Sequence, residues 1–448
     1  MRLSRVMLVL LVIMALFNGV DAHAAGRALS PQAANLLRLH METPAVGWAM
    51  STTGLLRTTD GSLHWRVVTP PALGRPLRRS PYALVTDFLG VQRAWVGIDN
   101  AVVSAVVGRS KAPTTLRLFR TDDGGRYWQA LPLLRLGTFY YADAPQFVSP
   151  DVGWLEIVRN VGAGSVWFDL YWTHDGGIHW QRVLHVGSPH SSPGLLGCDL
   201  CSAGLTFSSH MSGWFTGCWC GIGTGSSFLY VSRNAGRTWR PLSLPAPSHI
   251  RLGTIGTLPP TLFDRDNGIL PAVVYQRITT PGRERAFFDA YVTHDGGRHW
   301  TPTTPVPISY PRAGPEILHS FPNTRFGFFV IGKQLYRTRD GGKHWQAIPE
   351  SIPLEHSETM QFLDGHHGFA LQAGDTQGTR SILLRTGDGG ATWKIIRATV
   401  GTYRARIHRS SQVSYASRTY RPRAVALLSS HLACSYPGTG LAARPHCR

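Results

Sequence analysis

Apolar residues along this chain fall into short runs, and polar turn residues separate one run from the next. Runs such as GLLRT at 54–58 and QLYRT at 334–338 mix apolar and polar positions and are bounded by Gly, Asp, Asn or Lys. Such alternation is typical of half-buried β-strands, and Gly, Asp and Asn form the tight turns that join them. The pattern therefore predicts an all-β chain built from short antiparallel strands.

A nine-residue string that ends in tryptophan recurs seven times. The closing tryptophans lie between 45 and 63 residues apart. A period of about 40–50 residues or somewhat more is typical of propeller blades or of another repeat array. The copies, called the boxes below, are RTTDGSLHW (57–65), RTDDGGRYW (120–128), WTHDGGIHW (172–180), VSRNAGRTW (231–239), VTHDGGRHW (292–300), RTRDGGKHW (337–345) and RTGDGGATW (385–393).

A second signal keeps step with the boxes. A short apolar run built on Gly and a neighbouring residue that is usually aromatic precedes each box, as in VGWAM at 46–50 and FGFFV at 326–330. With the runs before and after it, each repeat holds four strands, and seven repeats predict one seven-bladed β-propeller over residues 33–400. Because each repeat runs through its strands in order, we expect the ring to close by blade packing rather than by a shared strand.

The box has the chemistry of a turn between the third and fourth strands. An Asp carboxylate accepts backbone N–H groups of its own turn, and Gly-Gly supplies positive φ angles. The Trp begins the next strand and buries its ring between blades. The fourth box has Asn234 and Ala235 in place of Asp and Gly, which predicts a looser turn. The residues expected to be structural are Asp60, Asp123, Asp175, Asn234, Asp295, Asp340, Asp388, Trp65, Trp128, Trp180, Trp239, Trp300, Trp345 and Trp393.

The order Gly-Trp, apolar strand and Thr-x-Asp-Gly-Gly-x-x-Trp resembles the Asp-box (bacterial neuraminidase) repeat, over about residues 36–396. The chain is similar in this respect to the photosystem II assembly and stability factor-like family, whose members are seven-bladed propellers. The resemblance implies the fold. It leaves the function open, since Asp-boxes also occur in sialidases, xyloglucan hydrolases and sortilin-type receptors.

Residues 1–24 have the features of a secretory signal peptide. Arg2 and Arg5 precede an apolar run at 6–17, and Ala22-His23-Ala24 forms a small-x-small cleavage pattern before Ala25. The apolar run is short for a transmembrane helix. We therefore predict an exported chain, extracellular or associated with the cell envelope, with an uncleaved N-terminal anchor as the alternative.

Basic residues dominate the charge of the chain, with a formal net charge of +19. Residues 401–448 contain eight Arg and no Asp, Glu or Lys, which predicts a basic disordered tail. Such charge favours anionic surfaces, for example phospholipid headgroups or acidic cell-wall polymers; general composition is the alternative explanation. No nucleic-acid recognition motif accompanies the charge, and we expect a monomer whose membrane contact is at most peripheral.

Six cysteines fall into two groups. Cys198, Cys201, Cys218 and Cys220 lie in the fourth repeat, and Cys434 and Cys447 lie in the tail. In an exported chain the first four predict disulfides that join Cys198 or Cys201 to Cys218 or Cys220. A four-thiolate metal site is the alternative.

The sequence offers no catalytic, cofactor-binding or metal site with a recognised signature. It lacks the Arg-Ile-Pro motif of sialidases, and no pair of carboxylates of the kind glycosidases need stands out. Repeats three and five share Phe-Asp-x-Tyr-x-Thr-His, with Asp169 and Tyr171 matching Asp289 and Tyr291. We expect these residues to be structural, with His174 and His294 in exposed turns; a pocket or a cation site is the alternative.

These observations favour a non-catalytic binding or assembly scaffold at the cell envelope, whose partner is another protein or an anionic envelope component. On this view the chain is more readily a binding protein than an enzyme. We expect contacts at the most variable connections, 107–115, 159–166, 189–205 and 275–285. The alternative is a carbohydrate-active hydrolase, sialidase-like or another glycosidase, that uses the mouth of the propeller.

Overall fold

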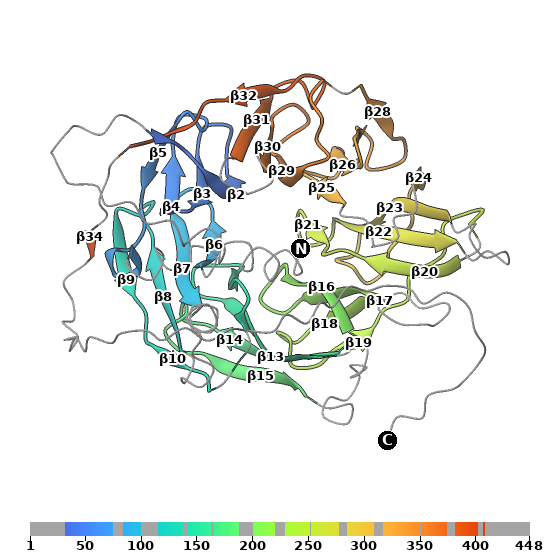
Figure 1. Ribbon diagram of the computed structural model, residues 1–448. Coiled ribbons are helices and arrows are strands. Elements are labelled where there is room, and N and C mark those ends of the chain that lie inside the picture. The colour runs from blue at the N-terminus through green and yellow to red at the C-terminus, as the bar shows by residue number, and fades with distance from the viewer. Residues whose placement is uncertain are drawn as a thin grey trace.

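The computed structural model describes residues 32–74, 84–99, 115–137, 139, 141–162, 165–187, 200–219, 229–250, 252–276, 285–308, 317–349, 351–373, 381–401 and 406–407. Seven antiparallel sheets stand around a common centre and confirm the predicted all-β, seven-bladed propeller (Figure 1). Each repeat of the sequence forms one blade.

Blades 1 to 4 are built from consecutive strands. Blade 1 contains β2 (Leu36–Met41), β3 (Gly47–Ser51), β4 (Gly54–Thr58) and β5 (His64–Val67). Blade 2 contains β6 (Leu84–Leu89), β7 (Arg93–Asp99), β8 (Thr115–Thr121) and β9 (Tyr127–Ala130), and the short β10 (Leu134–Arg135) pairs with β8. Blade 3 contains β11 (Tyr141–Ala142), β12 (Gln146–Phe147), β13 (Gly153–Gly162), β14 (Ser165–Thr173) and β15 (Gln181–Val186). Blade 4 contains β16 (Leu200–Phe207), β17 (Gly213–Trp219), β18 (Leu229–Ser232) and β19 (Arg240–Pro241).

Blades 5 to 7 follow the same order. Blade 5 contains β20 (Leu252–Thr257), β21 (Thr261–Leu262), β22 (Gly268–Gln276), β23 (Arg285–Thr293) and β24 (Val306–Ile308). Blade 6 contains β25 (Leu318–Ser320), β26 (Gly327–Ile331), β27 (Gln334–Thr338) and β28 (Gln346–Ile348). Blade 7 contains β29 (Ser357–Phe362), β30 (Gly368–Ala373), β31 (Ser381–Thr386) and β32 (Lys394–Ile396).

Within a blade, the first strand lies nearest the centre and the fourth lies at the rim (Figure 1). The boxes form the turns between third and fourth strands, as the sequence predicts. In every blade the box turn also touches the turn between the first and second strands, because a box N–H donates to a carbonyl there, for example Gly61 to Ala45 and Gly296 to Asp266. The two turns of a blade therefore lie at the same end, and the second-to-third connections lie at the opposite end.

Ring closure differs from our expectation. Strand β33 (Thr399–Gly401) pairs in parallel with β5 at the rim of blade 1, and β1 (Gln32–Ala33) pairs with the other side of β33. Residues from both ends of the propeller thus add to the same sheet, so a shared strand assists closure. A second addition, β34 (Arg406–Ile407), pairs with β9 of blade 2. Chain beyond residue 400 is therefore in contact with two blades.

The core lies between blades rather than in the middle of the ring. Each of the seven interfaces between neighbouring blades holds its own cluster of buried apolar side chains. The cluster between blades 7 and 1 joins Leu39 and Leu56 to Phe369 and Leu383, and thereby seals the ring with the same chemistry as the other six. Over the described residues, no helix is long and apolar enough to cross a bilayer.

Candidate functional site

The box carboxylates are used within their own turns. In all seven boxes, a Thr or Ser two residues earlier donates its hydroxyl to the box oxygen, as Thr173 does to Asp175 at 2.9 Å. The same oxygen accepts a backbone N–H from four residues later, such as His179 N–H at 2.9 Å. The seven box side chains stand in seven separate turns, so they do not assemble into one site.

A histidine reinforces four of these turns. His179 Nδ1 lies 2.6 Å from Asp175 Oδ2, and His64, His299 and His344 repeat the contact in their own boxes. Burial opposes ionisation, but the hydrogen bonds from His179 and Thr173 outweigh it and lower the pKa of Asp175 to about 2. The pKa of Asp340 is lowered to about 2 for the same reasons. These carboxylates are ionised, fully bonded parts of the framework.

The fourth box is not loose, contrary to our prediction. Asn234 Oδ1 accepts the Ser232 hydroxyl at 3.0 Å and the Thr238 N–H at 2.9 Å, and so replaces the carboxylate in full. Ala235 adopts the glycine conformation with a φ of 61°. The turn keeps its shape at the cost of backbone strain, because a Cβ disfavours positive φ.

The box tryptophans pack at the blade interfaces. Trp65, Trp128, Trp239, Trp300 and Trp393 are buried, whereas Trp180 and Trp345 are partly exposed. Several indole N–H groups donate to a carbonyl of their own turn, such as Trp180 to Gly177 at 3.0 Å. Trp128 donates instead to Val68 of the preceding blade at 2.7 Å.

A different set of polar residues links the blades near the centre. One position on each first strand lies opposite the residue that follows the first small residue of the second strand, which is Ala94 in blade 2 and Gly in the other six blades. Its occupants are His40, Asp87, Gln146, Thr206, Thr261, Ser320 and Gln361. We call this the bridge position. Gln361 accepts the N–H of Met41 in the next blade at 2.7 Å and donates to its carbonyl at 2.8 Å. Ser320 makes the same pair of bonds to Phe362, at 2.8 and 3.4 Å.

Asp87 occupies the bridge position of blade 2 and departs from this pattern. Its Oδ2 accepts the Phe147 N–H of blade 3 at 2.6 Å. A carboxylate has no hydrogen to donate, whereas a neutral carboxylic acid has one. Burial raises the pKa of Asp87 to about 7, against the opposing effects of the Phe147 N–H and His40 and with a further rise from the Glu42 charge. Asp87 is thus a carboxyl group that gains and loses its proton near neutral pH.

His40 and Glu42 stand on the blade 1 side of Asp87. His40 Nε2 lies 3.1 Å from Glu42 Oε1, and the His40 ring stacks on Phe88 with centroids 5.2 Å apart. Trp48 stacks on the same phenyl ring at 5.2 Å. On its other side the Trp48 ring carries the Arg57 guanidinium, 4.6 Å from the ring centroid.

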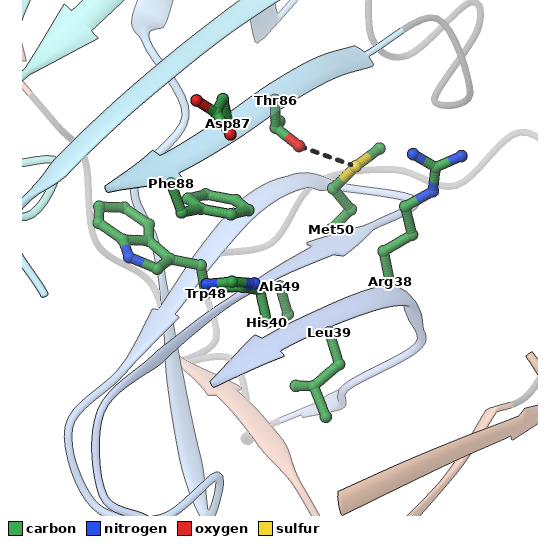
Figure 2. A pocket seen from close by; sticks show the side chains of 9 residues that line it. All are labelled: Arg38, Leu39, His40, Trp48, Ala49, Met50, Thr86, Asp87 and Phe88. Atoms are coloured by element: carbon green, nitrogen blue, oxygen red, sulfur yellow. Dashed lines mark hydrogen bonds between the residues drawn. The ribbon is translucent and has the colours of Figure 1, made fainter. Parts of the chain in front are cut away.

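Of these residues, His40, Trp48, Asp87 and Phe88 line a cavity between blades 1 and 2. It has a volume of about 220 Å³ and is lined by Arg38, Leu39, His40, Trp48, Ala49, Met50, Thr86, Asp87 and Phe88. Figure 2 shows His40, Trp48 and Phe88 gathered at one side, with Arg38 and Met50 at the other. Thr86 donates to the Met50 sulfur at 3.8 Å and closes the wall between them. We call this the inner cavity; it combines aromatic faces, a cation and the proton-bearing Asp87.

The shared Asp-x-Tyr motif behaves differently in its two copies. In blade 3, Asp169 is buried and bonds Arg159 at 2.8 Å and His185 at 2.5 Å, both from its own blade. In blade 5, Asp289 is buried and accepts the Thr303 N–H at 3.1 Å and its hydroxyl at 2.8 Å. Both side chains bond within their own blade.

Burial raises the pKa of the tyrosine in both copies of the motif. Burial and the nearby Asp169 raise the pKa of Tyr171, whose hydroxyl accepts from Arg159 at 3.2 Å. Tyr291 is fully buried and donates to the Pro245 carbonyl at 2.9 Å. The two histidines, His174 and His294, lie in exposed turns, as the sequence suggests.

The cysteine prediction falls largely outside the described residues. Cys198, Cys220, Cys434 and Cys447 are not among them, and for Cys201 and Cys218 the structure describes the backbone alone. The register of β16 and β17 places Cys201 opposite Cys218. In the part of the chain that the structure describes, no three His, Cys, Asp or Glu side chains form a group that could hold a metal ion.

The sequence signalled some of these features and missed others. The Asp169 motif was visible as a repeated string, but its partners Arg159 and His185 carried no signal of their own. The inner cavity was missed, because its residues come from two repeats and share no motif. The position of Asp87 and Glu42 near the aromatic pair Trp48 and Phe88 emerges only from the packing of blade 1 against blade 2.

Comparison with known proteins gives structural relatives alone. No protein-family model matches the chain, and no curated protein matches it. The GH74 xyloglucanase of Xanthomonas campestris is similar over 83% of this chain, with 13% identity and a TM-score of 0.49; the chain covers 55% of the xyloglucanase, about half its length. YCF48 of Cyanidioschyzon merolae is similar over 81% of this chain and 95% of its own, with 18% identity and a TM-score of 0.39. An ulvan lyase of family PL25 is similar over 81% of this chain and 94% of its own, with 12% identity and a TM-score of 0.41.

This comparison corrects our expectation of a non-catalytic scaffold, and with it the expectation that the chain is more readily a binding protein than an enzyme. The similar propellers are for the most part enzymes that act on polysaccharides, namely a xyloglucanase, an arabinanase, an arabinofuranosidase and an ulvan lyase. The propeller fold of this chain rests on its own seven sheets, and its activity is a matter for proposal.

Proposed function

We propose that this protein is a carbohydrate-active hydrolase and that the inner cavity is its sugar-binding subsite. Phe88 and the ring of His40 offer flat apolar faces against which the C–H face of a sugar ring packs. Arg38 and Thr86 supply polar groups beside those faces. Pockets that combine apolar walls with a few convergent polar groups are the usual place for a small ligand.

The observation that best supports this proposal is that two carboxyl groups, those of Asp87 and Glu42, lie in unlike environments. Burial raises the pKa of Asp87 to about 7, and Glu42 is close enough for its charge to contribute to that rise. Glycosidases use two such groups, one protonated and one ionised, and environments that push two pKa values apart identify the acid and the base. The box carboxylates are bonded within their own turns, whereas Asp87 lines the inner cavity and Glu42 is close enough to Asp87 for its charge to affect the pKa of Asp87.

The roles follow from this difference. The proton of Asp87 passes to the glycosidic oxygen as the bond from that oxygen to the anomeric carbon breaks. A water molecule adds to the anomeric carbon and gives its proton to the Glu42 carboxylate, so that one water is consumed for each bond cleaved. His40, which is 3.1 Å from Glu42, orients that carboxylate. The Phe147 N–H bond to Oδ2 leaves the other oxygen of Asp87 to carry the proton.

Two further statements belong to this proposal. We propose that the seven boxes are Asp-box repeats, supported by the shared Thr–Asp–backbone bonding of every turn and by the solved propellers that the fold resembles. We also propose that the protein works outside the cytoplasm, supported by the signal-like sequence of residues 1–24. A polysaccharide substrate is consistent with that location.

The test incubates the full-length chain with a panel of plant and bacterial polysaccharides and measures turnover as the release of reducing ends. Asp87→Asn and Glu42→Gln should each lower kcat by about 100-fold or more, since positioned acid–base catalysis contributes about 10²–10⁴-fold. Asn at position 87 keeps an acceptor for Phe147 and an N–H donor, as Gln does in other blades, so the fold should be retained. Activity should fall as pH rises through about 7, where Asp87 loses its proton.

Matched controls are available at the surface. Glu355→Gln removes a carboxylate that pairs with Lys333 at 3.5 Å, and Asp122→Asn removes one that pairs with Arg93 at 3.0 Å. Both lie away from the inner cavity and should leave kcat unchanged. Absence of turnover on every polysaccharide, or full activity in both Asp87→Asn and Glu42→Gln, would contradict the proposal.

A further inference from the structure

One face of blade 3 carries an unusual group of side chains. Residues alternate along β14, so Trp167, Asp169 and Tyr171 lie on the same face, and Phe168 and Leu170 lie on the other, within the core between blades 3 and 4. Across the β14–β15 pairing, His185 stands opposite Asp169 and Arg182 stands opposite Tyr171. We call Trp167, Asp169, Arg182 and His185, with Arg159, the blade 3 cluster.

A single carboxylate at the base of the cluster holds three basic side chains. Asp169 is 1% exposed and lies 2.5 Å from Arg159 Nη2, 2.5 Å from His185 Nδ1 and 3.6 Å from Arg182 Nη1. Both arginines are charged at all physiological pH values, so one negative charge meets two permanent positive charges. His185 adds a further positive charge in its protonated form. The cluster therefore has a net positive charge on a fixed, buried anchor.

The basic groups at the edge of the cluster reach solvent. The side chain of Arg182 is 55% exposed and that of His185 is 49% exposed, whereas Arg159 is 19% exposed. Arg159 thus belongs to the base of the cluster, together with the hydroxyl of Tyr171 that it contacts at 3.2 Å. Arg182 and His185 form the part that an incoming ligand meets.

An exposed tryptophan completes the face. Trp167 is 39% exposed, two residues before Asp169 on the same strand. Residues two apart on a strand are separated by about 7 Å, so the indole and the basic groups lie side by side along one direction. A flat apolar ring next to a cation matches a sugar ring that carries a negative charge, because the ring packs on the indole while the charge meets the guanidinium.

We propose that the blade 3 cluster is a binding site for an acidic polysaccharide, a chain of sugars that bear carboxylate groups. Trp167 contacts the face of one sugar, and Arg182 with His185 binds the carboxylate of the same or the next sugar. The site is separate from the inner cavity, which lies between blades 1 and 2, and holds the polymer without acting on its bonds. The net charge of +19 on the whole chain draws such a polymer to the protein.

Blade 5 provides an internal reference for this assignment. Its Asp289 occupies the same place in the motif but is 0% exposed and is held by Thr303 rather than by basic side chains. Tyr291 is 0% exposed, and Phe287, a partly buried core residue, stands two residues before Asp289 on the same face of β23, in the place that Trp167 takes in blade 3. Blade 5 thus keeps the buried Asp and Tyr without the exposed basic and indole groups, which separates the structural part of the motif from the binding part.

The experiment measures binding of the full-length protein to polygalacturonic acid by isothermal titration calorimetry, with fully methyl-esterified pectin as the uncharged probe of the same backbone. Arg182→Ala and Trp167→Ala should each weaken binding to polygalacturonic acid by about tenfold, the effect of losing one contact of about 1.4 kcal/mol. Binding should weaken as salt concentration rises. The methyl-esterified polymer should bind at least tenfold more weakly than the acid form.

Arg240→Ala is the matched control, because Arg240 is also an exposed arginine on the outermost strand of its blade, β19. It removes the same charge and should leave binding unchanged within twofold. Equal loss in Arg240→Ala and Arg182→Ala would show a general charge effect and overturn the proposal, as would equal binding of the esterified polymer. Tighter binding of anionic phospholipid vesicles or of DNA, lost in the same two variants, would also overturn it. Asp87→Asn should bind normally, so failure of the hydrolase proposal and failure of this one are distinguishable.

Discussion

Blades 3 and 5 carry nearly the same string of residues, yet the shared aspartate has a different environment in each. Asp169 forms ion pairs with Arg159 and His185. Asp289 instead accepts hydrogen bonds from the uncharged N–H and hydroxyl groups of Thr303. The backbone position is the same, because both residues lie on the third strand, three residues before the first residue of the box. What differs is the set of side chains that the neighbouring strands present.

This difference has an electrostatic consequence. Burial raises the pKa of Asp289, since its hydrogen bonds do not fully offset the loss of water, and its Oδ2 is buried without a hydrogen-bond partner among the described residues. In blade 3 two guanidinium groups, those of Arg159 and Arg182, lie beside the buried carboxylate. A repeated motif therefore specifies a place in the fold, and the cross-strand partners specify the chemistry of that place.

The largest expected effect concerns the box tryptophans of the two blades. Trp300 is 4% exposed and packs between blades 4 and 5, whereas Trp180 is only partly buried. Trp300→Ala should lower the free energy of unfolding by about 3–5 kcal/mol, the range for removal of a buried aromatic side chain. Trp180→Ala should cost less. Chemical denaturation of both variants measures the difference, and a larger loss in Trp180→Ala would contradict the packing argument.

The second comparison removes the shared aspartate itself. Asp169→Ala leaves Arg159 without its carboxylate and should destabilise the protein by about 3 kcal/mol, the low end of the range for breaking a buried ion pair. Asp289→Ala leaves the Thr303 groups without an acceptor and should cost about 1–2 kcal/mol. Urea titration of both variants provides the test. Equal losses would mean that Asp169 contributes no more than an ordinary hydrogen-bond acceptor.

The fold could be predicted from the sequence because the same motif occurs in every blade. Seven copies of one box fix the blade number, and the alternation of apolar residues fixes the strands. Ring closure was not accessible, because β33 follows the last repeat and resembles none of the earlier strands. The bridge position was hidden for a related reason: His40, Asp87 and Gln361 share only a polar side chain, and their equivalence appears once the strands are in register.

The candidate site was the least predictable part. Asp87 and Glu42 come from different blades, and nothing in the spacing of residues 42 and 87 brings two carboxyl groups together. The partners of Asp169 lie 10 and 16 residues away on either side, where blade 5 has other side chains. Both proposed sites thus consist of residues that vary between repeats, whereas the residues shared by all repeats specify the framework.

The third test separates the two aspartates by their response to pH. The pKa of Asp289 is raised in the folded protein, so the folded state holds a proton that the unfolded state loses above about pH 4. Stability should therefore fall as pH increases from that value toward the folded pKa. Asp289→Asn should remove this part of the pH dependence. Thermal unfolding between about pH 4, near the pKa of a free carboxyl group, and about pH 8 measures it. An unchanged profile would place the proton elsewhere.

The smallest expected effect lies in blade 4, which separates the two blades compared above. Ala235 holds a φ of 61° in a turn where the other six boxes have glycine at that place, and Asn234 keeps every hydrogen bond of the turn. Ala235→Gly relieves the strain of a left-handed residue and should stabilise the protein by about 0.5–1 kcal/mol, after the entropy that glycine adds to the unfolded chain is subtracted.

The reverse change, from Gly to Ala, needs a position without a side-chain clash. Gly177→Ala in blade 3 and Gly297→Ala in blade 5 are unsuitable, since a Cβ there meets Leu131 at 3.1 Å and Trp214 at 2.9 Å. Gly296→Ala is the direct mirror: its φ of 72° imposes the same strain, and its Cβ meets the Arg265 carbonyl at 2.8 Å, so it should destabilise by more than Ala235→Gly stabilises. Differential scanning calorimetry of the two variants measures both signs, and a destabilised Ala235→Gly would show that the methyl group contributes packing that outweighs the strain.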